Sequence, residues 1–336
     1  MRDFAPRLVA WQRRHGRHGL PWQGTRDPYR IWLAEVMLQQ TQVAAVIPYY
    51  ERFLACFPDV AALAAASQED VLRLWSGLGY YARGRNLHAA AKAIATLGSF
   101  PRSAEKLQAL PGVGRSTAAA IAVFAFGRRE AILDGNAKRV FARCFGEEGA
   151  SRLWALAERL LPRHGMRAYT QGLMDLGAMV CTRSNPACER CPVARGCVAR
   201  REGRIAELPA RRPRRALPQR EATWLVLVSG AQVLLERRAP LGLWGGLWTF
   251  PELDGADAAA HCRRVLGCEI AGARKLAPLE HGFTHFTLRA HPLLCAVERR
   301  SPRAESAGRM WLDTADAPHA AVPVPVRMVL QRLAKG

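Results

Sequence analysis

Four cysteines within one short segment are the strongest chemical signal in the sequence. They follow the spacing C-x6-C-x2-C-x5-C and are Cys181, Cys188, Cys191 and Cys197. Four soft thiolates from one compact loop match the ligands of a [4Fe-4S] cluster, which needs one donor for each iron. Structural zinc sites usually pair two short knuckles, whereas only Cys188 and Cys191 form one here. The spacing therefore favours the cluster over zinc, and over thiols that hold no metal.

Two carboxylates in contrasting settings could act as an acid and as a stabilising anion. Glu35 lies in the apolar segment WLAEVMLQQ, where burial should raise its pKa toward that of a general acid. Asp134, in LDGNAKRV, precedes an expected helix whose dipole and free N–H groups favour its ionised form. One protonable and one ionised carboxylate suit the cleavage of a glycosidic bond. A solvated helix face for Glu35 and a plain N-cap for Asp134 are the alternatives.

The segment LPGVG at 110–114 predicts a turn between two short helices. Its glycines, Gly112 and Gly114, let the backbone approach a ligand closely, and the N–H groups that follow, around Ser116, can hold a DNA phosphate. An ordinary tight helix turn is the alternative. The formal net charge of +21 over 336 residues favours a polyanionic partner, although an Arg-rich composition can also follow from base usage in a genome.

The periodicity of apolar residues divides the chain into an all-α part and a mixed part. Helical spacing dominates residues 30–198, with Ser67 and Ser103 at expected N-caps. An Arg- and Pro-rich stretch predicts a basic linker over 199–221. Strand-like runs follow it, at 224–228, 232–236 and 283–290. The sequence thus predicts an all-α domain over 1–198, the linker, and an α+β domain over 222–336.

The remaining five cysteines have no matching spacing, which is typical of thiols in a reducing compartment. There is no signal-peptide pattern at the start, and no run is long and apolar enough to cross a bilayer. We therefore expect a cytoplasmic protein without a membrane partner.

These motifs resemble those of the endonuclease III superfamily of DNA glycosylases and, within it, the MutY-type adenine DNA glycosylases. The broader resemblance rests on LPGVG, the aspartate in LDGN and the cysteine spacing. The narrower one rests on LPWQ at 20–23, EVMLQQTQV at 35–43, GLGYYARGRNLH at 77–88 and the appended domain. Over nearly the whole chain, it implies a helix-hairpin-helix glycosylase domain with a [4Fe-4S] loop, followed by a Nudix-like α+β domain.

The resemblance also implies roles for individual residues. Glu35 would protonate adenine N7, Asp134 would stabilise the cationic sugar, and Asn136 would order Asp134 and the attacking water. The adenine must be flipped out of the duplex to reach these groups. The pocket for the flipped base would be formed by Trp22, Gln23, Leu38 and Gln171.

Two further positions bear on DNA distortion and on the reaction type. Gln40 and Tyr81 would wedge into the base stack, with Tyr80 behind, although Gln40 could instead cap a helix and the tyrosines could be core. Bifunctional relatives carry a Schiff-base lysine at the position of Ser116. Because serine cannot form the imine, the resemblance implies base excision without an efficient lyase step.

The second domain resembles Nudix hydrolases through GLWGGLWTFPEL at 242–253. It has HCRR at 261–264 where those enzymes need magnesium-binding glutamates, so pyrophosphate hydrolysis is not expected. The resemblance implies that this domain recognises 8-oxoguanine through Phe283, Thr284 and His285. Thr284 replaces the family's usual serine but keeps a hydroxyl. A metal pair formed by His281 and His285 is the weaker alternative, since no third ligand is evident.

Together these features predict a monomeric, monofunctional glycosylase that removes adenine paired with 8-oxoguanine or guanine in double-stranded DNA. It would work at the bacterial nucleoid and leave the abasic site to other enzymes. A bifunctional enzyme for oxidised pyrimidines is disfavoured by the lack of a lysine at Ser116. A noncatalytic iron-sulfur DNA-binding protein is disfavoured because it would need neither Glu35 nor Asp134.

Overall fold

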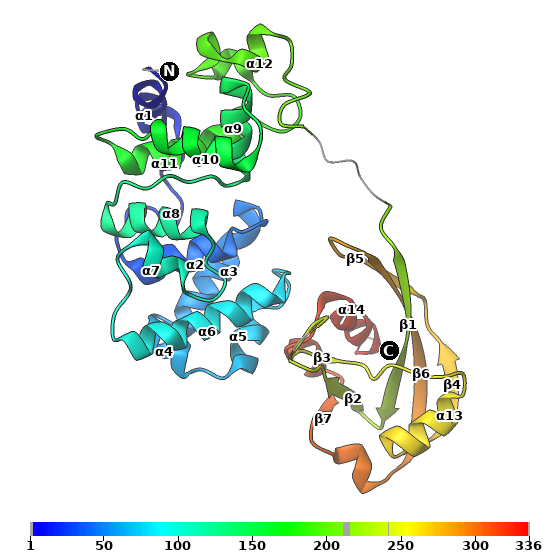
Figure 1. Ribbon diagram of the computed structural model, residues 1–336. Helices are drawn as coiled ribbons and strands as arrows, with labels where there is room; N and C mark the ends of the chain where they lie inside the picture. Colours follow the sequence, from blue (N-terminus) through cyan, green and yellow to red (C-terminus); the bar gives the residue numbers. More distant parts are fainter. Residues whose placement is uncertain (1–2, 211–215, 241, 335–336) are drawn as a thin grey trace. The chain divides into compact units, whose positions relative to one another are not determined.

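The computed structural model describes residues 3–210, 216–240 and 242–334 (Figure 1). The N-terminal part is helical and the C-terminal part is built on a mixed sheet, as predicted. The helices of the first part are α1 (Phe4–His15), α2 (Pro28–Met37), α3 (Val43–Cys56), α4 (Val60–Ala65), α5 (Gln68–Trp75), α6 (Tyr81–Leu97), α7 (Ala104–Gln108), α8 (Arg115–Phe126), α9 (Gly135–Phe145), α10 (Ala150–Arg159) and α11 (Met166–Asp175).

Local capping explains where several of these helices begin. Ser67 Oγ accepts the Asp70 N–H at 3.0 Å at the start of α5, and Ser103 Oγ accepts the Lys106 N–H at 3.3 Å at the start of α7. Both predicted N-caps are confirmed. At α2, Asp27 accepts the Tyr29 N–H while Pro28 occupies the first turn, where its missing N–H costs nothing.

Helix α8 is the central helix of the α-helical part. It carries the small buried residues Ala118, Ala119, Ala120 and Ala122, which let neighbouring helices approach closely. Helices α2, α7 and α11 all contact it. Helix α11 also contacts α9, so α8 and α9 pack against the same helix.

A sequence of short elements follows α11 and carries the four cysteines. They are η1 (Leu176–Val180), η2 (Cys188–Arg190), η3 (Ala194–Gly196) and α12 (Val198–Arg201). Apart from η1, a π-helical continuation of α11, this segment has little regular structure of its own, so its shape depends on contacts with α9.

The C-terminal part contains one seven-stranded sheet with the order β3-β2-β1-β6-β4, to which β5 and β7 add by pairing with β6 and β2. Strands β1 and β6 are parallel, and the other strand pairs among the described residues are antiparallel. The strands are β1 (Gln219–Ser229), β2 (Gln232–Arg237), β3 (Trp248–Thr249), β4 (Cys268–Lys275), β5 (Leu279–Gly282), β6 (Thr287–Arg300) and β7 (Arg309–Asp313).

Side-chain alternation lets two helical segments cover opposite faces of this sheet (Figure 1). Leu225 and Leu227 of β1 pack with Leu266, in the segment formed by α13 (Ala258–His261) and η4 (Cys262–Leu266). Val228 instead lines a cavity with Val329 of α14 (Val324–Leu333). Two 3-10 turns, η5 (Pro302–Glu305) and η6 (Ala317–His319), flank β7.

Two element boundaries differ from the sequence-based expectation. Residues 219–221, predicted to lie in the linker, belong to β1 and pair with 287–289 of β6, while Ala199 is buried in α12. Residues 283–286, expected to begin a strand, form the turn between β5 and β6. The central linker residues 211–215 lie outside the described residues.

The contact pattern separates two compact units. Residues 66–85 are grouped with the C-terminal unit and not with the other helices of the N-terminal part. The predicted domain limits at 198 and 222 therefore stay predictions. Within the described ranges, no helix is long and apolar enough to span a membrane.

Candidate active site

One cavity in the helical part gathers five of the residues singled out in the sequence. Its volume is about 380 Å³, within the range of small-molecule sites. Glu35 lies on its wall together with the four predicted pocket residues Trp22, Gln23, Leu38 and Gln171. These residues come from the segment before α2, from α2 and its C-cap residue Leu38, and from α11, so these elements together assemble the cavity.

Glu35 is held in a state suited to proton donation. Burial raises its pKa to about 8, and the nearby charge of Asp134 adds to the effect. The carboxyl group is therefore mostly protonated at neutral pH while it faces the cavity. The alternative of a solvated helix face does not fit this environment.

Asp134 occupies the N-cap of α9, and its Oδ1 accepts the Ala137 N–H at 2.7 Å. We expected the helix N-terminus to dominate and favour the anion, but the pKa of Asp134 is raised above its ordinary value. Burial is the largest cause, and hydrogen bonds from the N–H groups of Ala137 and Asn136 offset it only in part. The residue is thus both a cap and a desolvated carboxylate, and it lies just outside the lining of the cavity that holds Glu35.

Arg139 is a site residue that the sequence analysis missed. Its guanidinium donates to Asn136 Oδ1 at 2.8 Å and to the carbonyls of Gly177 at 2.6 Å and Cys181 at 2.7 Å. It thereby joins the start of α9 to the first cysteine of the loop. Gly177 is required here, because a Cβ at this position would lie 2.4 Å from the Cβ of Asn136. The three-residue spacing of Asn136 and Arg139 on one helix was the available signal.

Ser116 supports the backbone that leads into Asp134. Its Oγ accepts the N–H of Leu133, the residue before Asp134, at 3.0 Å. The Ser116 side chain therefore orients the backbone segment that leads into Asp134.

The hairpin formed by α7 and α8 has the predicted geometry. Gly112 has φ +75°, and a Cβ there would approach the Asn86 Cβ to 2.7 Å, so both its conformation and its surroundings call for glycine. Gly114 is the N-cap of α8, with free space around it. The first N–H groups of α8 are available for a phosphate in this arrangement.

Two exposed side chains stand on strained backbone. Gln40 has φ +59° and Tyr80 has φ +48°, a conformation that residues other than glycine rarely adopt. The prediction named Tyr81 as the wedge, but this side chain is only 9% exposed, and its hydroxyl approaches Ser76 Oγ and the Gly77 N–H. Tyr80 is 45% exposed. The left-handed backbone turns Tyr80 outward and Tyr81 inward, so the structure favours Tyr80 for that role.

A buried ion pair forms part of the cavity's support and was also missed. Asp175, with no exposed surface, accepts the Arg17 N–H at 3.0 Å and Arg17 Nε at 2.7 Å. It also accepts Gln171 Nε2 at 2.9 Å, and Gln23 Nε2 donates to the Arg17 carbonyl at 3.0 Å. Asp175 therefore anchors residues on two walls of the cavity at once.

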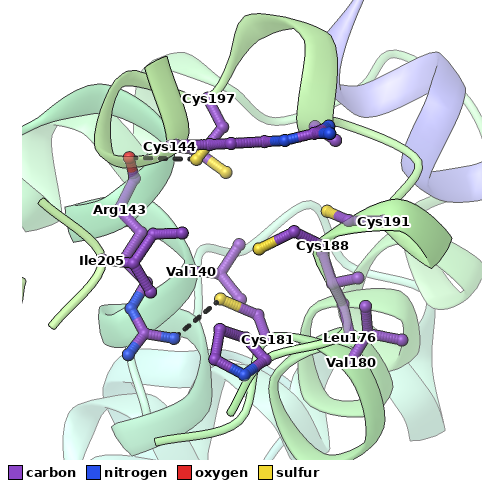
Figure 2. Close-up of a pocket in the computed structure, with 13 residues that line it drawn as sticks. Val140, Arg143, Cys144, Leu176, Val180, Cys181, Cys188, Cys191, Cys197 and Ile205 are labelled. Carbon is purple, nitrogen blue, oxygen red and sulfur yellow. Dashed lines mark hydrogen bonds between the residues drawn. The ribbon is translucent and has the colours of Figure 1, made fainter. Parts of the chain in front are cut away.

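The four cysteines of the loop surround one space, as Figure 2 shows. Apolar side chains fill the gaps between the sulfur atoms, among them Val140, Leu176 and Ile205. Within the described ranges, no three His, Cys, Asp or Glu side chains are close enough to hold one metal ion. Sulfur atoms spread around one cavity fit a multi-iron cluster better than a single tetrahedral zinc ion.

Helix α9 supports this loop through two consecutive residues. Arg143 donates to the carbonyls of Thr182, Arg183 and Leu208 and approaches Cys181 Sγ at 3.6 Å. The next residue, Cys144, is buried against Cys197. A hydrogen bond from Cys144 is the main cause that lowers the pKa of Cys197 to about 6, which favours the thiolate that a metal ligand needs.

In the C-terminal unit, the predicted recognition residues lie in the β5–β6 turn. Phe283 and Phe286 stack at 4.5 Å between ring centroids, and the Phe283 N–H donates to the Phe286 carbonyl at 2.8 Å. Thr284 and His285 are exposed at the tip, with Thr284 Oγ1 and His285 Nδ1 3.3 Å apart. The segment is a turn that presents a hydroxyl and an imidazole.

Comparison with known proteins gives two family matches. Residues 33–162 match the HhH-GPD superfamily base excision DNA repair proteins, and residues 223–332 match the NUDIX domain. The chain is 32% identical over 342 residues to the adenine DNA glycosylase of Buchnera aphidicola subsp. Acyrthosiphon pisum (strain APS), covering 99% of this chain and 98% of that one. It is 34% identical over 399 residues to the adenine DNA glycosylase of Rattus norvegicus, covering 98% and 77%.

Among solved structures, a thermostable thymine-DNA glycosylase is 29% identical, with a TM-score of 0.56, over 60% of this chain and 96% of that one. A non-covalent endonuclease III–DNA complex superposes with a TM-score of 0.53 at 21% identity, over 60% and 95%, and this match bears on the fold alone. The predicted helix-hairpin-helix fold followed by a Nudix-like domain is confirmed.

Proposed function

The chain belongs to the adenine DNA glycosylase family, and from this premise we propose that it excises adenine paired with 8-oxoguanine or guanine by monofunctional hydrolysis. The observation that carries the proposal is the cavity in which Glu35, protonated at neutral pH, lies among Trp22, Gln23, Leu38 and Gln171. The cavity is large enough for one flipped base.

Proton transfer to the base is the first step of the proposed reaction. Glu35 donates its proton to adenine N7, and the N-glycosidic bond breaks as the base accepts the bonding electron pair. The positive charge that develops on the sugar is stabilised by Asp134, whose own raised pKa reflects how little water surrounds it. Water then attacks C1′, and Asn136, held by Arg139, orders this water and Asp134.

The reaction stops at the abasic site because Ser116 offers no amine that could attack the sugar. Ser116 occupies the position where a bifunctional enzyme would carry lysine, and its hydroxyl is engaged with Leu133. We assign the hairpin around Gly112 and Gly114 to phosphate binding, with Gln40 and Tyr80 inserted beside the displaced bases. The protein would act as a monomer on bacterial DNA and leave the abasic product to other enzymes.

The four loop cysteines, Cys181, Cys188, Cys191 and Cys197, would hold a [4Fe-4S] cluster. When bound, the cluster would serve as a structural cross-link, since its four cysteines leave no open position for a substrate. Four arginines lie in or directly after this loop and can contact DNA phosphates: Arg190, Arg195, Arg200 and Arg201.

Recognition of 8-oxoguanine is assigned to the β5–β6 turn. Phe283, stacked on Phe286, supports the exposed pair Thr284 and His285, which can donate and accept hydrogen bonds. The residues that replace magnesium ligands support recognition without hydrolysis, because Cys262 lies in the apolar core of the domain.

A single-turnover assay on matched duplexes tests this proposal. One duplex carries adenine opposite 8-oxoguanine, a second carries it opposite guanine and a third opposite thymine, and each product is analysed with and without alkali. Adenine release from the first two, with strand cleavage only after alkali, is the expected result. Cleavage without alkali would contradict the monofunctional assignment, and equal release from all three duplexes would contradict the mispair specificity.

Thr284→Ala separates base recognition from chemistry. Loss of the hydroxyl should reduce the preference for 8-oxoguanine over guanine while adenine release from the guanine mispair stays close to wild type. An unchanged preference would contradict the assignment of this turn.

A further inference from the structure

A fifth cysteine lines the cavity of the four loop cysteines. Cys144 has no place in the C-x6-C-x2-C-x5-C spacing, yet α9 brings it to the same space, where it is only 5% exposed. Figure 2 shows its sulfur beside that of Cys197. A [4Fe-4S] cluster needs four protein thiolates, which the loop already supplies, so Cys144 is a neighbour of the cluster and not one of its ligands.

The hydrogen bonding of Cys197 depends on whether it binds iron. As a free thiol it donates to the Arg143 carbonyl at 3.3 Å. As an iron ligand it would have no proton and could only accept. The neighbouring Cys144 is buried, lines the same cavity, and has its sulfur beside that of Cys197. A thiol at this position can donate its S–H group to the sulfur of an iron-bound Cys197.

We propose that Cys144 is a positioning residue of the cluster site, whose S–H group donates a hydrogen bond to the Cys197 thiolate and makes the cluster harder to oxidise. This inference rests on the cluster proposed above. A hydrogen bond to a ligand sulfur withdraws electron density from it and stabilises the more negative, reduced state of the cluster. Oxidation removes one electron from the cluster and weakens that bond, so the bond opposes it.

Arg143 makes a corresponding contact with Cys181, at the other end of the loop. Two consecutive residues of α9 thus contact the first and last ligands. Arg143 also bonds three backbone carbonyls, so its substitution would disturb the loop itself. Cys144 offers the cleaner test, because its side chain has a single polar group.

The test compares Cys144→Ser, which keeps a donor, with Cys144→Val, which fills the space without one. Cys56→Val, at an exposed thiol of α3, controls for loss of a cysteine. Each full-length protein is assayed for iron and sulfide, and the fraction of oxidised cluster is then measured against applied potential. We expect equal loading in all four proteins. At a fixed potential the oxidised-to-reduced ratio should rise about fivefold in Cys144→Val, as for loss of one modest hydrogen bond, and little in Cys144→Ser.

Each possible result of this experiment either supports or contradicts the proposed role of Cys144. A wild-type potential in Cys144→Val would overturn it and leave Cys144 a packing residue. Loss of iron in Cys144→Val but not in Cys144→Ser would support it, because only the donor separates the two. Loss of iron in both would overturn it, since the donor alone would not suffice. Wild-type protein without iron and sulfide would overturn the proposed cluster itself, while the adenine-release assay would still test the glycosylase independently.

Discussion

Arg139 donates a hydrogen bond of 2.8 Å to the side-chain oxygen of Asn136, and the same guanidinium bonds the Cys181 carbonyl at 2.7 Å. A residue proposed to order the attacking water is therefore tied to the first cysteine of the cluster loop. One side chain thus links the cysteine loop to the start of α9, beside the proposed catalytic residues. A change in the cysteine loop should therefore alter the active site, and a change in the active site should alter the loop.

Arg139→Gln should lower both stability and activity. Hydrogen bonds from a charged group to buried carbonyls are worth about 1.5–3 kcal/mol each, so we expect a loss of roughly 2–4 kcal/mol in unfolding free energy. Adenine release should slow by about tenfold to a hundredfold as Asn136 shifts. Thermal unfolding and single-turnover kinetics measure the two effects. The exposed neighbour Lys138→Gln is the control, and equal behaviour of the two variants would contradict the proposed link.

The rate of adenine release should depend on pH through both carboxylates. Glu35 must be protonated, and its pKa of about 8 predicts a rate that falls about tenfold per pH unit above that value. Asp134 must be ionised, and because burial raises its pKa, the acid limb should lie above the ordinary aspartate range. A single-turnover pH profile checks both limbs. In Glu35→Gln, the rate of adenine release should fall about 10²–10⁴-fold, and the decline of the rate at alkaline pH should disappear from the profile. A wild-type rate in this variant would remove Glu35 from the mechanism.

Ser116→Lys should give the protein a lyase activity. The new amine would stand at the end of the hairpin, next to the segment that carries Asp134, where it could form an imine with the opened sugar. We expect strand cleavage without alkali and a borohydride-trapped protein–DNA adduct. Ser116→Ala, which removes the bond to Leu133 but adds no amine, should release adenine more slowly and form no adduct. An adduct in wild-type protein would contradict the monofunctional assignment.

Local signals in the sequence were sufficient for much of the fold. Ser67 and Ser103 cap helices as predicted because an N-cap depends on the few residues around it. The sequence did not show that Tyr80 is exposed and Tyr81 buried, because the directions of these side chains depend on a backbone φ of +48° at Tyr80 that the residue types do not specify. The turn at 283–286 was taken for strand because aromatic residues fit both.

Contacts between residues far apart in the chain could not be predicted from the sequence, for a different reason. Arg139 and Gly177 meet only because α9 packs against η1, and Arg17 meets Asp175 across 158 residues of chain. The residues proposed to contact the substrate lie in recognisable sequence motifs, whereas the residues that support them are identified only by their position in the fold. The two carboxylates proposed for catalysis could therefore be named from the sequence, while their supports required the structure.

Asp175→Asn tests one such support at the cavity. The carboxylate is fully buried and accepts three hydrogen bonds from Arg17 and Gln171, so loss of its charge leaves the Arg17 guanidinium partly buried without an ionic partner. Breaking a buried pair from one side costs about 3–5 kcal/mol, and we expect urea unfolding to show a loss near the lower end because asparagine keeps one acceptor. Adenine release should also slow, as Gln171 loses its anchor on the cavity wall. Glu158→Gln removes the exposed ion pair with Arg115 and is the matched control, with an expected change below about 1 kcal/mol. If the two variants unfold at the same urea concentration, Asp175 is not the anchor of this wall.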